Sequence, residues 1–123
     1  MKVKSKKQDM KFALFGHGYH LCYMIEKLIK LGFSKPVVIT HPQKLHERDR
    51  KLINDPKIYK YLFDVVQEYD VKILESEKTN CDDVYSFLKK HQSNVGFSVS
   101  CRSIIHEDII NYFNGNIFNF HPS

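Results

Sequence analysis

The sequence predicts an α/β protein, a Rossmann-like three-layer sandwich with a mostly parallel sheet that is truncated after a fifth strand. Short apolar segments rich in β-branched and aromatic residues alternate with longer segments whose apolar residues recur every three or four positions. The first pattern is typical of buried parallel strands and the second of amphipathic helices. Because the two alternate throughout, helices are expected to cover both faces of the sheet.

The first third of the chain predicts two strands with a helix between them. A strand over residues 11–15 ends at the glycines Gly16 and Gly18, and residues 36–40 form a second, β-branched strand. One apolar stripe at helical spacing defines the helix between them: Leu21, Met24, Ile25, Leu28 and Ile29. Gly32 is placed to end this helix.

The middle of the chain begins with a polar connection over residues 41–57, a length usually linked to function or mobility. A second helical stripe follows: Ile58, Leu62, Val65, Val66 and Tyr69. Residues 71–74 form a third strand. Asn80 is expected to cap the next helix, with Asp82 and Asp83 in its first turn, where the helix dipole favours negative charge.

The last thirty residues predict a strand, a connection, a helix and a final strand. The strand covers residues 95–99 and the connection residues 100–105. The helix opens near residues 106–108, and residues 116–120 form the fifth strand.

Length and composition set limits on the class of protein. The 123 residues predict one domain, and 42% apolar residues are enough for a core. No apolar run approaches the roughly 18 to 20 residues of a membrane helix, and no signal peptide is visible. The three cysteines, Cys22, Cys81 and Cys101, are odd in number and unpatterned, which indicates free thiols. A cytoplasmic protein without a membrane partner is therefore expected.

The formal net charge of +5 belongs mostly to the first ten residues. They contain four of the 19 basic residues and one of the 14 acidic ones, so the remaining chain is only slightly basic. We therefore expect a basic, disordered tail over residues 1–10 and a folded domain over residues 11–123. Nucleic acid is not expected as a partner, because that inference needs charge clustered on a folded face.

The turn formed by Gly16, His17 and Gly18 occupies the place of a phosphate-binding loop. Leu21 replaces the third glycine of the dinucleotide fingerprint, and the second strand ends in Thr40 and His41 rather than in an acidic residue. A tight turn that brings the helix close to the sheet is the favoured interpretation.

Metal binding and thiol chemistry are both disfavoured by the sequence. Histidines at positions 17, 20, 41 and 46 and Cys22 show neither a paired-cysteine spacing nor a His-Glu-x-x-His helix, so no metal is expected. Arg102 would lower the pKa of the Cys101 thiol, but nothing nearby provides a matched base for a nucleophile.

Asn119 and His121 are the sharpest candidates for chemistry. Side chains alternate along a strand, so both are expected on one face, with Phe118 and Phe120 on the other. They stand at the carboxyl end of an apolar strand, where open α/β sheets place ligand sites. The alternative is a strand end with a capping asparagine and a surface histidine.

Residues 119–123, Asn-Phe-His-Pro-Ser, resemble the Asn-x-His-x-Ser signature of folate-dependent formyltransferases. Residues 95–105 are similar to the strand and loop that hold the pterin of 10-formyltetrahydrofolate in that family. The resemblance extends from about residue 11 to the end and implies the N-terminal formyltransferase domain. It assigns the pterin to Cys101, Arg102, Ser103, Ile104 and Ile105, and it places His17 and His41 near the amine substrate.

The resemblance also implies a mechanism. The amide of Asn119 would donate to the oxyanion of an acyl-transfer intermediate, and His121 would handle the proton. The family's aspartate, some thirty to forty positions after the histidine, would lie beyond Ser123. We therefore expect this chain to be an incomplete fragment that is inactive alone, and a homodimer of the full-length protein is left open.

Three amines compete within the resemblance. Methionyl-tRNA formyltransferases need a basic C-terminal region that is not seen here, and glycinamide ribonucleotide formyltransferases have a Gly-Asn-Ser loop that residues 16–18 do not match. Nucleotide-sugar formyltransferases fit best, which implies a nucleotide-linked 4-amino-4,6-dideoxy sugar of lipopolysaccharide O-antigen synthesis. A non-catalytic folate-binding or interaction remnant of the fold is the alternative from another class.

Overall fold

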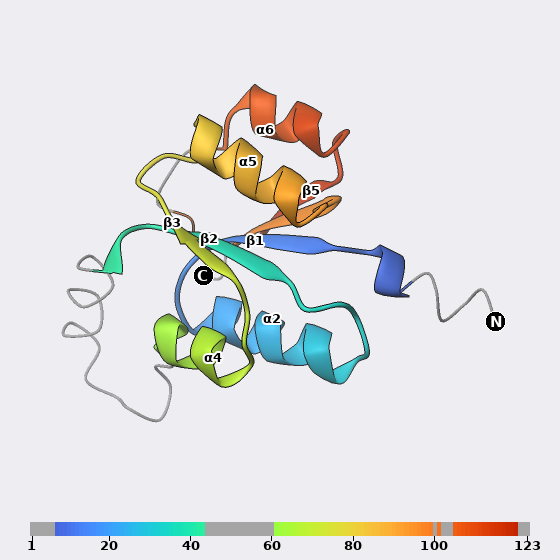
Figure 1. Ribbon diagram of the computed structural model, residues 1–123, viewed down its shortest axis with the longest axis vertical. Helices are drawn as coiled ribbons and strands as arrows, with labels where there is room; N and C mark the ends of the chain where they lie inside the picture. Colours follow the sequence, from blue (N-terminus) through green and yellow to red (C-terminus); the bar gives the residue numbers. More distant parts are fainter. Residues whose placement is uncertain (1–6, 44–60, 100, 102–104, 121–123) are drawn as a thin grey trace.

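A computed structural model of the chain describes residues 7–43, 61–99, 101 and 105–120, and all structural statements refer to these. Five parallel strands form one sheet in the order β3-β2-β1-β4-β5 (Figure 1). The strands are β1 (Phe12–Gly16), β2 (Val37–Thr40), β3 (Ile73–Glu75), β4 (Val95–Val99) and β5 (Ile117–Phe120). The predicted α/β class is thus confirmed.

Helices cover both faces of the sheet (Figure 1). They are α2 (Tyr19–Lys30), α4 (Leu62–Glu68), α5 (Asp82–Lys90) and α6 (Glu107–Tyr112). Helices α2 and α4 lie on one side, and α5 and α6 lie on the other. None of the described helices is long and apolar enough to cross a membrane.

Alternation along β1 divides the interior into two cores. Leu14 points to the side of α2 and α4, where it packs with Leu21 and Leu62. Phe15 points to the side of α5 and α6, where it packs with Leu88. All of these residues are 1% exposed or less, so each face of the sheet is sealed by its own helix pair.

The register aligns the carboxyl ends of the strands along one edge of the sheet. Phe15 pairs with Ile39 of β2 and with Ser98 of β4, and Ser98 pairs with Asn119 of β5. The order reverses at β1, with β2 on one side and β4 on the other, which is where such sheets place ligands.

Most predicted elements are found within one or two residues of their expected bounds. Strand β4 covers the expected residues, and β3 begins two residues later than expected. The predicted cap of α5 is wrong: Cys81, not Asn80, takes the N-cap position, with an extended backbone and no side-chain cap bond. The Cys81 carbonyl accepts the first helical bond from Tyr85, which fixes the start one residue later. The expected helical residue Ile58 lies outside the described residues.

Part of the segment predicted as a tail, residues 7–10, is described. Residues 7–9 form a helical turn, and the Lys7 amine donates to the Leu31 carbonyl at 2.9 Å. The amide of Asn94 donates to the Asp9 carbonyl at 2.8 Å. These bonds join the segment to partners that are distant in sequence. Residues 1–6 lie outside the described part, so the boundary of the tail stays a prediction.

Candidate functional site

The turn after β1 is built around a glycine that no other residue can replace without a shift. Gly16 has φ of 137°, and a Cβ there would overlap the Val99 carbonyl oxygen of β4. The same carbonyl accepts a bond from the His17 amide at 3.2 Å. This close approach agrees with a tight turn, the interpretation favoured by the sequence.

His17 and His41, both predicted to lie near the substrate, are neighbours at this turn. The ring centroids of His17 and His41 are 4.8 Å apart at an interplanar angle of 73°. His41 is only 6% exposed, and His17 is partly buried. Beside them, the Thr40 hydroxyl donates to the Gly16 carbonyl at 2.5 Å and ties the ends of β1 and β2 together.

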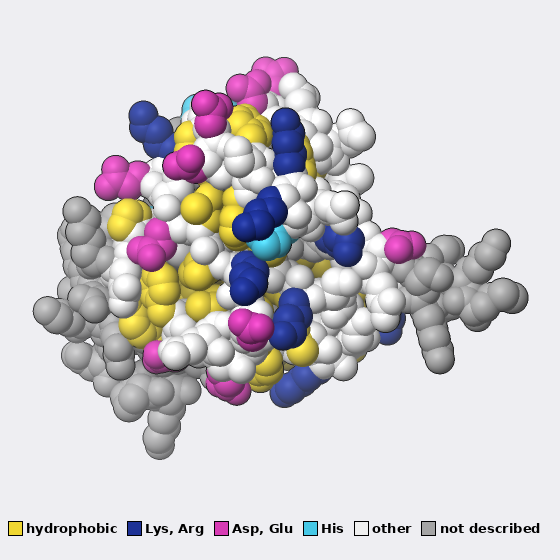
Figure 2. Space-filling model, viewed as in Figure 1, with side chains coloured by type: hydrophobic (Ala, Val, Ile, Leu, Met, Phe, Trp, Pro, Cys, Tyr) yellow, Lys and Arg dark blue, Asp and Glu magenta, His cyan; other side chains and the backbone are white. Residues whose placement is uncertain are grey.

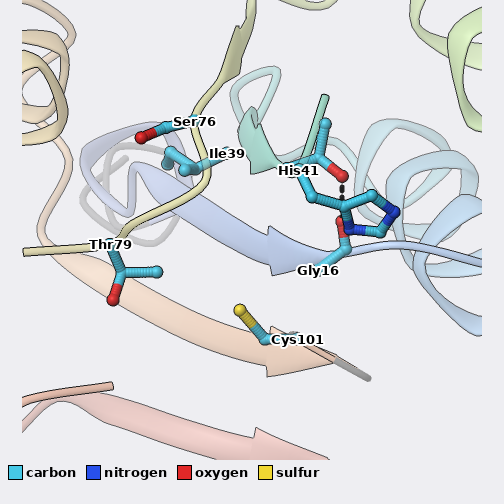
Figure 3. A pocket seen from close by; sticks show the side chains of 7 residues that line it. Gly16, Ile39, His41, Ser76, Thr79 and Cys101 are labelled. Carbon is cyan, nitrogen blue, oxygen red and sulfur yellow. Dashed lines mark hydrogen bonds between the residues drawn. The ribbon is translucent and has the colours of Figure 1, made fainter. Parts of the chain in front are cut away.

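A pocket opens beside this pair at the carboxyl edge of the sheet (Figure 3). Its lining comes from the ends of β1 and β2 and from the segments after β3 and β4: Gly16, Ile39, Thr40, His41, Ser76, Thr79 and Cys101. Residues with hydroxyl groups and a cysteine thus line a small space beside apolar Ile39.

Only the two ends of the predicted pterin loop are described. Cys101 and Ile105 are partly buried and pack against the core on the side of α5 and α6. Cys101 lines the pocket. All three cysteines, Cys22, Cys81 and Cys101, are thiols and form no disulfide. Arg102, Ser103 and Ile104 lie outside the described residues, so the predicted pterin contacts stay predictions.

Asn119 is exposed near the carboxyl end of β5. It shares a face with Ile117, which packs against the same core as Cys101 and Ile105. Phe118 and Phe120 lie on the opposite face, where their rings are 5.5 Å from those of Phe97 and His20, respectively. The predicted alternation is therefore found over residues 118–120, while His121 lies outside the described part.

The structure adds residues that the sequence analysis did not assign to the site. His20, considered there only as a metal ligand, joins the first turn of α2 to the end of β5 through Phe120. Thr79 and Ser76 line the pocket although they lie far from β1 in sequence. The alternation along β5 predicts on which face of the sheet Phe120 lies, but no local sequence pattern indicates that it contacts His20.

Acidic side chains surround the carboxyl edge on the side of α5 and α6. Asp82 and Asp108 lie in the first turns of these two helices. Between them, burial and then the charge of Asp108 raise the pKa of the Tyr85 phenol above its usual value, so its neutral form is favoured. Within the described ranges, no group of three or more histidine, cysteine or acidic side chains could hold a metal ion.

Fold and site together define a Rossmann-like α/β domain with its candidate site at the carboxyl edge of the sheet. The chain is similar to methionyl-tRNA formyltransferase of Thermotoga maritima, with 26% identity over 114 residues. The enzyme of the same name from Thermotoga sp. strain RQ2 is 27% identical over the same length. Each alignment covers 93% of this chain and 35% of the relative, so the chain spans about a third of the length of these curated relatives.

No family model matches the chain. The two relatives support a relationship to formyltransferases, the family that the signature at residues 119–123 resembles.

Proposed function

We propose that the protein transfers a formyl group from 10-formyltetrahydrofolate to an amine at the carboxyl edge of its sheet. One observation matters most: Asn119 is exposed at this edge, paired in register with Ser98 of the strand that leads to Cys101. An amide donor thus lies on the strand next to the one that leads to the proposed folate loop. The similarity to two formyltransferases over most of the chain supports the proposal.

The chemistry needs an oxyanion donor and a path for one proton. A neutral amine attacks the formyl carbon, and its new carbon–nitrogen bond forms a tetrahedral intermediate with a negative oxygen. The Asn119 amide donates to that oxygen. His121 takes the proton from the attacking nitrogen and returns it to N10 of the folate as the old carbon–nitrogen bond breaks. The products are a formamide and tetrahydrofolate.

The proposed donor site lies between the end of β4 and the start of α6. Cys101 and Ile105 flank the loop and are fixed by the core, which suits a loop that presents backbone groups. A pterin edge offers donors and acceptors that main-chain amides and carbonyls of residues 101–105 would match. A folate-bound structure tests this proposal, and a pterin bound away from these residues would refute it.

For the amine we propose a nucleotide-linked amino sugar of the 4-amino-4,6-dideoxy type. The resemblance supports this choice, and three residues with hydroxyl groups, Thr40, Ser76 and Thr79, are among those that line the pocket. His41 is one of the residues that line the pocket, and the His17 ring lies beside it, so both are proposed as neighbours of the sugar. Glycinamide ribonucleotide fits less well, since the turn at Gly16 lacks the Gly-Asn-Ser loop.

Methionyl-tRNA is the second candidate amine. Both relatives are named methionyl-tRNA formyltransferases, and this is the observation that favours it. The amino sugar and methionyl-tRNA differ in size and charge, so testing them side by side as substrates distinguishes the two proposals.

A panel of amines tests the proposed function. The full-length protein is mixed with 10-formyltetrahydrofolate and, separately, with a nucleotide-linked 4-amino sugar, methionyl-tRNA or glycinamide ribonucleotide. Tetrahydrofolate release is followed by absorbance and the formylated product by mass spectrometry. We expect release and product with the amino sugar. Product only with methionyl-tRNA would replace the amine but keep the chemistry, and release with none of them would favour a non-catalytic remnant.

A further inference from the structure

The lysines of the described chain gather at the edge of the sheet opposite the candidate site. Apart from Lys78, all of them flank the amino ends of strands or the carboxyl ends of helices: Lys7, Lys11, Lys27, Lys30, Lys35, Lys72, Lys89 and Lys90. In a parallel sheet with helical crossovers these positions all fall on one edge. We call this surface the amino-terminal edge.

Three of these lysines stand just before strands that are neighbours in the sheet. Ala13 of β1 pairs with Val37 of β2, and Lys11 and Lys35 stand two residues before them. Ile73 of β3 pairs with Val38, and Lys72 directly precedes Ile73. Continued alternation places Lys11 and Lys72 on the face covered by α5, and Lys35 precedes β2, the strand between β1 and β3. The end of α5 contributes more positive charge beside them.

His91, which follows α5, reports how close these charges lie. Burial lowers the pKa of the His91 imidazole, and the nearby charges of Lys90 and Lys72 lower it further. A helix end and a strand start far apart in sequence therefore lie within electrostatic reach of one imidazole.

The amino-terminal edge continues on the other side of the sheet, where apolar side chains accompany the lysines. Lys30 ends α2, and the next residue, Leu31, is 50% exposed. Lys7 donates to the Leu31 carbonyl at 2.9 Å and lies 5.6 Å from the centre of the Phe33 ring. Met10, in the same short segment, is 38% exposed.

Among the described residues, lysines are concentrated at the amino-terminal edge. In Figure 2 dark blue side chains run down the middle of one face around a histidine, while most acidic side chains lie toward its left and upper margins. Asp9, Glu26, Glu68 and Asp70 are the acidic exceptions near the amino-terminal edge. Helix dipoles explain lysines in the last turns of α2 and α5. They do not explain Lys11, Lys35 and Lys72, because strands have only small net dipoles.

We propose that the amino-terminal edge docks on the surface of an anionic lipid bilayer. Its charge is spread over both sides of the sheet, which fits a broad surface better than a single phosphate backbone. Its cationic groups are lysines and not the arginines that favour bidentate nucleic-acid contacts. Leu31 and Met10 protrude where they would enter the headgroup region. The candidate site at the opposite edge then faces water.

The proposal predicts a salt-dependent and an apolar contribution to binding. Each lysine close to an anionic surface strengthens binding about fivefold, an effect that falls off within a Debye length. Leu31 adds an apolar contribution that salt does not screen. This docking does not depend on the proposed function, and it goes against the expectation of no membrane partner.

Vesicle co-sedimentation with the full-length protein tests the proposal. Vesicles of phosphatidylcholine alone are compared with vesicles that also contain phosphatidylglycerol, at low and at raised salt. The variant Lys35→Gln/Lys72→Gln removes two charges from the amino-terminal edge. Lys78→Gln/Asn80→Asp lowers the net charge equally at the opposite edge and is the matched control. Circular dichroism verifies that all variants fold.

We expect binding only to the anionic vesicles and a loss of about 10- to 30-fold in the double lysine variant at low salt, with the control close to wild type. Leu31→Gln should weaken binding at both salt concentrations. The proposal is overturned if anionic vesicles do not bind, or if both double variants lose affinity equally. It is also overturned if RNA binds in a lysine-dependent way while Leu31→Gln has no effect on vesicles.

Discussion

Gly16 shows how a single residue sets the geometry of the candidate site. A side chain there would meet the Val99 carbonyl, and the positive φ adds strain for any L-residue. We predict that Gly16→Ala destabilises the fold by about 3 kcal/mol or more, since backbone strain alone costs roughly 1–3 kcal/mol. The free energy of unfolding in urea measures this loss.

Gly32 offers the matched comparison, because it also has positive φ but no heavy atom lies within 4 Å of the place that a Cβ would take. Gly32→Ala should cost only the left-handed strain of about 1–2 kcal/mol. Equal losses for the two variants would show that the approach of β1 to β4 is not the cause.

His91 makes stability depend on pH at the amino-terminal edge. Its pKa in the folded chain lies below the usual 6.5, so between these two values the unfolded chain binds more protons than the folded one. The free energy of unfolding therefore rises with pH through this window, and the contribution is lost as pH falls below 6.5. We predict that His91→Gln removes this part of the slope, as measured by urea unfolding from about pH 5 to pH 8.

The effect of Lys72 on the pKa of His91 can be tested separately, with Lys78→Gln as the control. Lys72→Gln should bring the pKa of His91 closer to its usual value, which an NMR titration of the ring measures directly. Lys78→Gln, at the opposite edge, should leave the titration unchanged. A titration that both variants shift equally would argue against a local effect of Lys72.

At the scale of elements, Gly96 of β4 is a point where β5 and the end of α6 come close to the β4 backbone. A Cβ there would lie 3.0 Å from Ile117 of β5 and 3.1 Å from the Phe113 ring that follows α6. We predict that Gly96→Ala destabilises the fold by about 1–3 kcal/mol, as overpacking usually does. Urea unfolding of the single variant tests this.

A second substitution separates overpacking from other causes. Ile117→Val alone should cost about 0.5–1.5 kcal/mol by removing a methyl group. In the Gly96→Ala background it should cost less or recover stability, because it makes room for the added methyl. Additive losses in the double variant would contradict the packing account.

Elements are predictable from the sequence where local patterns decide them. The apolar residues of β4 and the helical stripe of α2 give both elements within a residue or two. The cap of α5 and the turn at residues 7–9 are not predictable in this way, since they depend on the backbone path and on bonds to distant groups. Local patterns also leave the strand order open, although that order decides which strand ends become neighbours.

At the scale of the whole molecule, the parallel sheet separates two surfaces with different chemistry. The carboxyl edge combines the histidine pair, the pocket and Asn119. The amino-terminal edge collects all of the described lysines except Lys78, whereas the charge count along the sequence draws attention only to the tail. Charge that is scattered in sequence becomes a patch only when the topology brings strand starts and helix ends together.

The candidate site is partly visible in the sequence. His17 follows the first predicted strand after Gly16, His41 directly follows the second, and the structure places their rings 4.8 Å apart. Thr79 and His20 carry no such signal, because their proximity to the strand ends follows from long crossovers. The role of Asn119 stays a prediction that rests on the resemblance and on its place at the edge.

The central claim is that Asn119 stabilises the oxyanion in formyl transfer. Its most direct test is single-turnover transfer by the full-length Asn119→Ala protein, with folate affinity measured separately. Asn116→Ala, at the exposed residue directly before β5, is the control. We predict a loss of about 100- to 1,000-fold in turnover with folate affinity little changed, the effect of removing one oxyanion donor. Unchanged turnover, or an equal loss of folate affinity, would contradict the account.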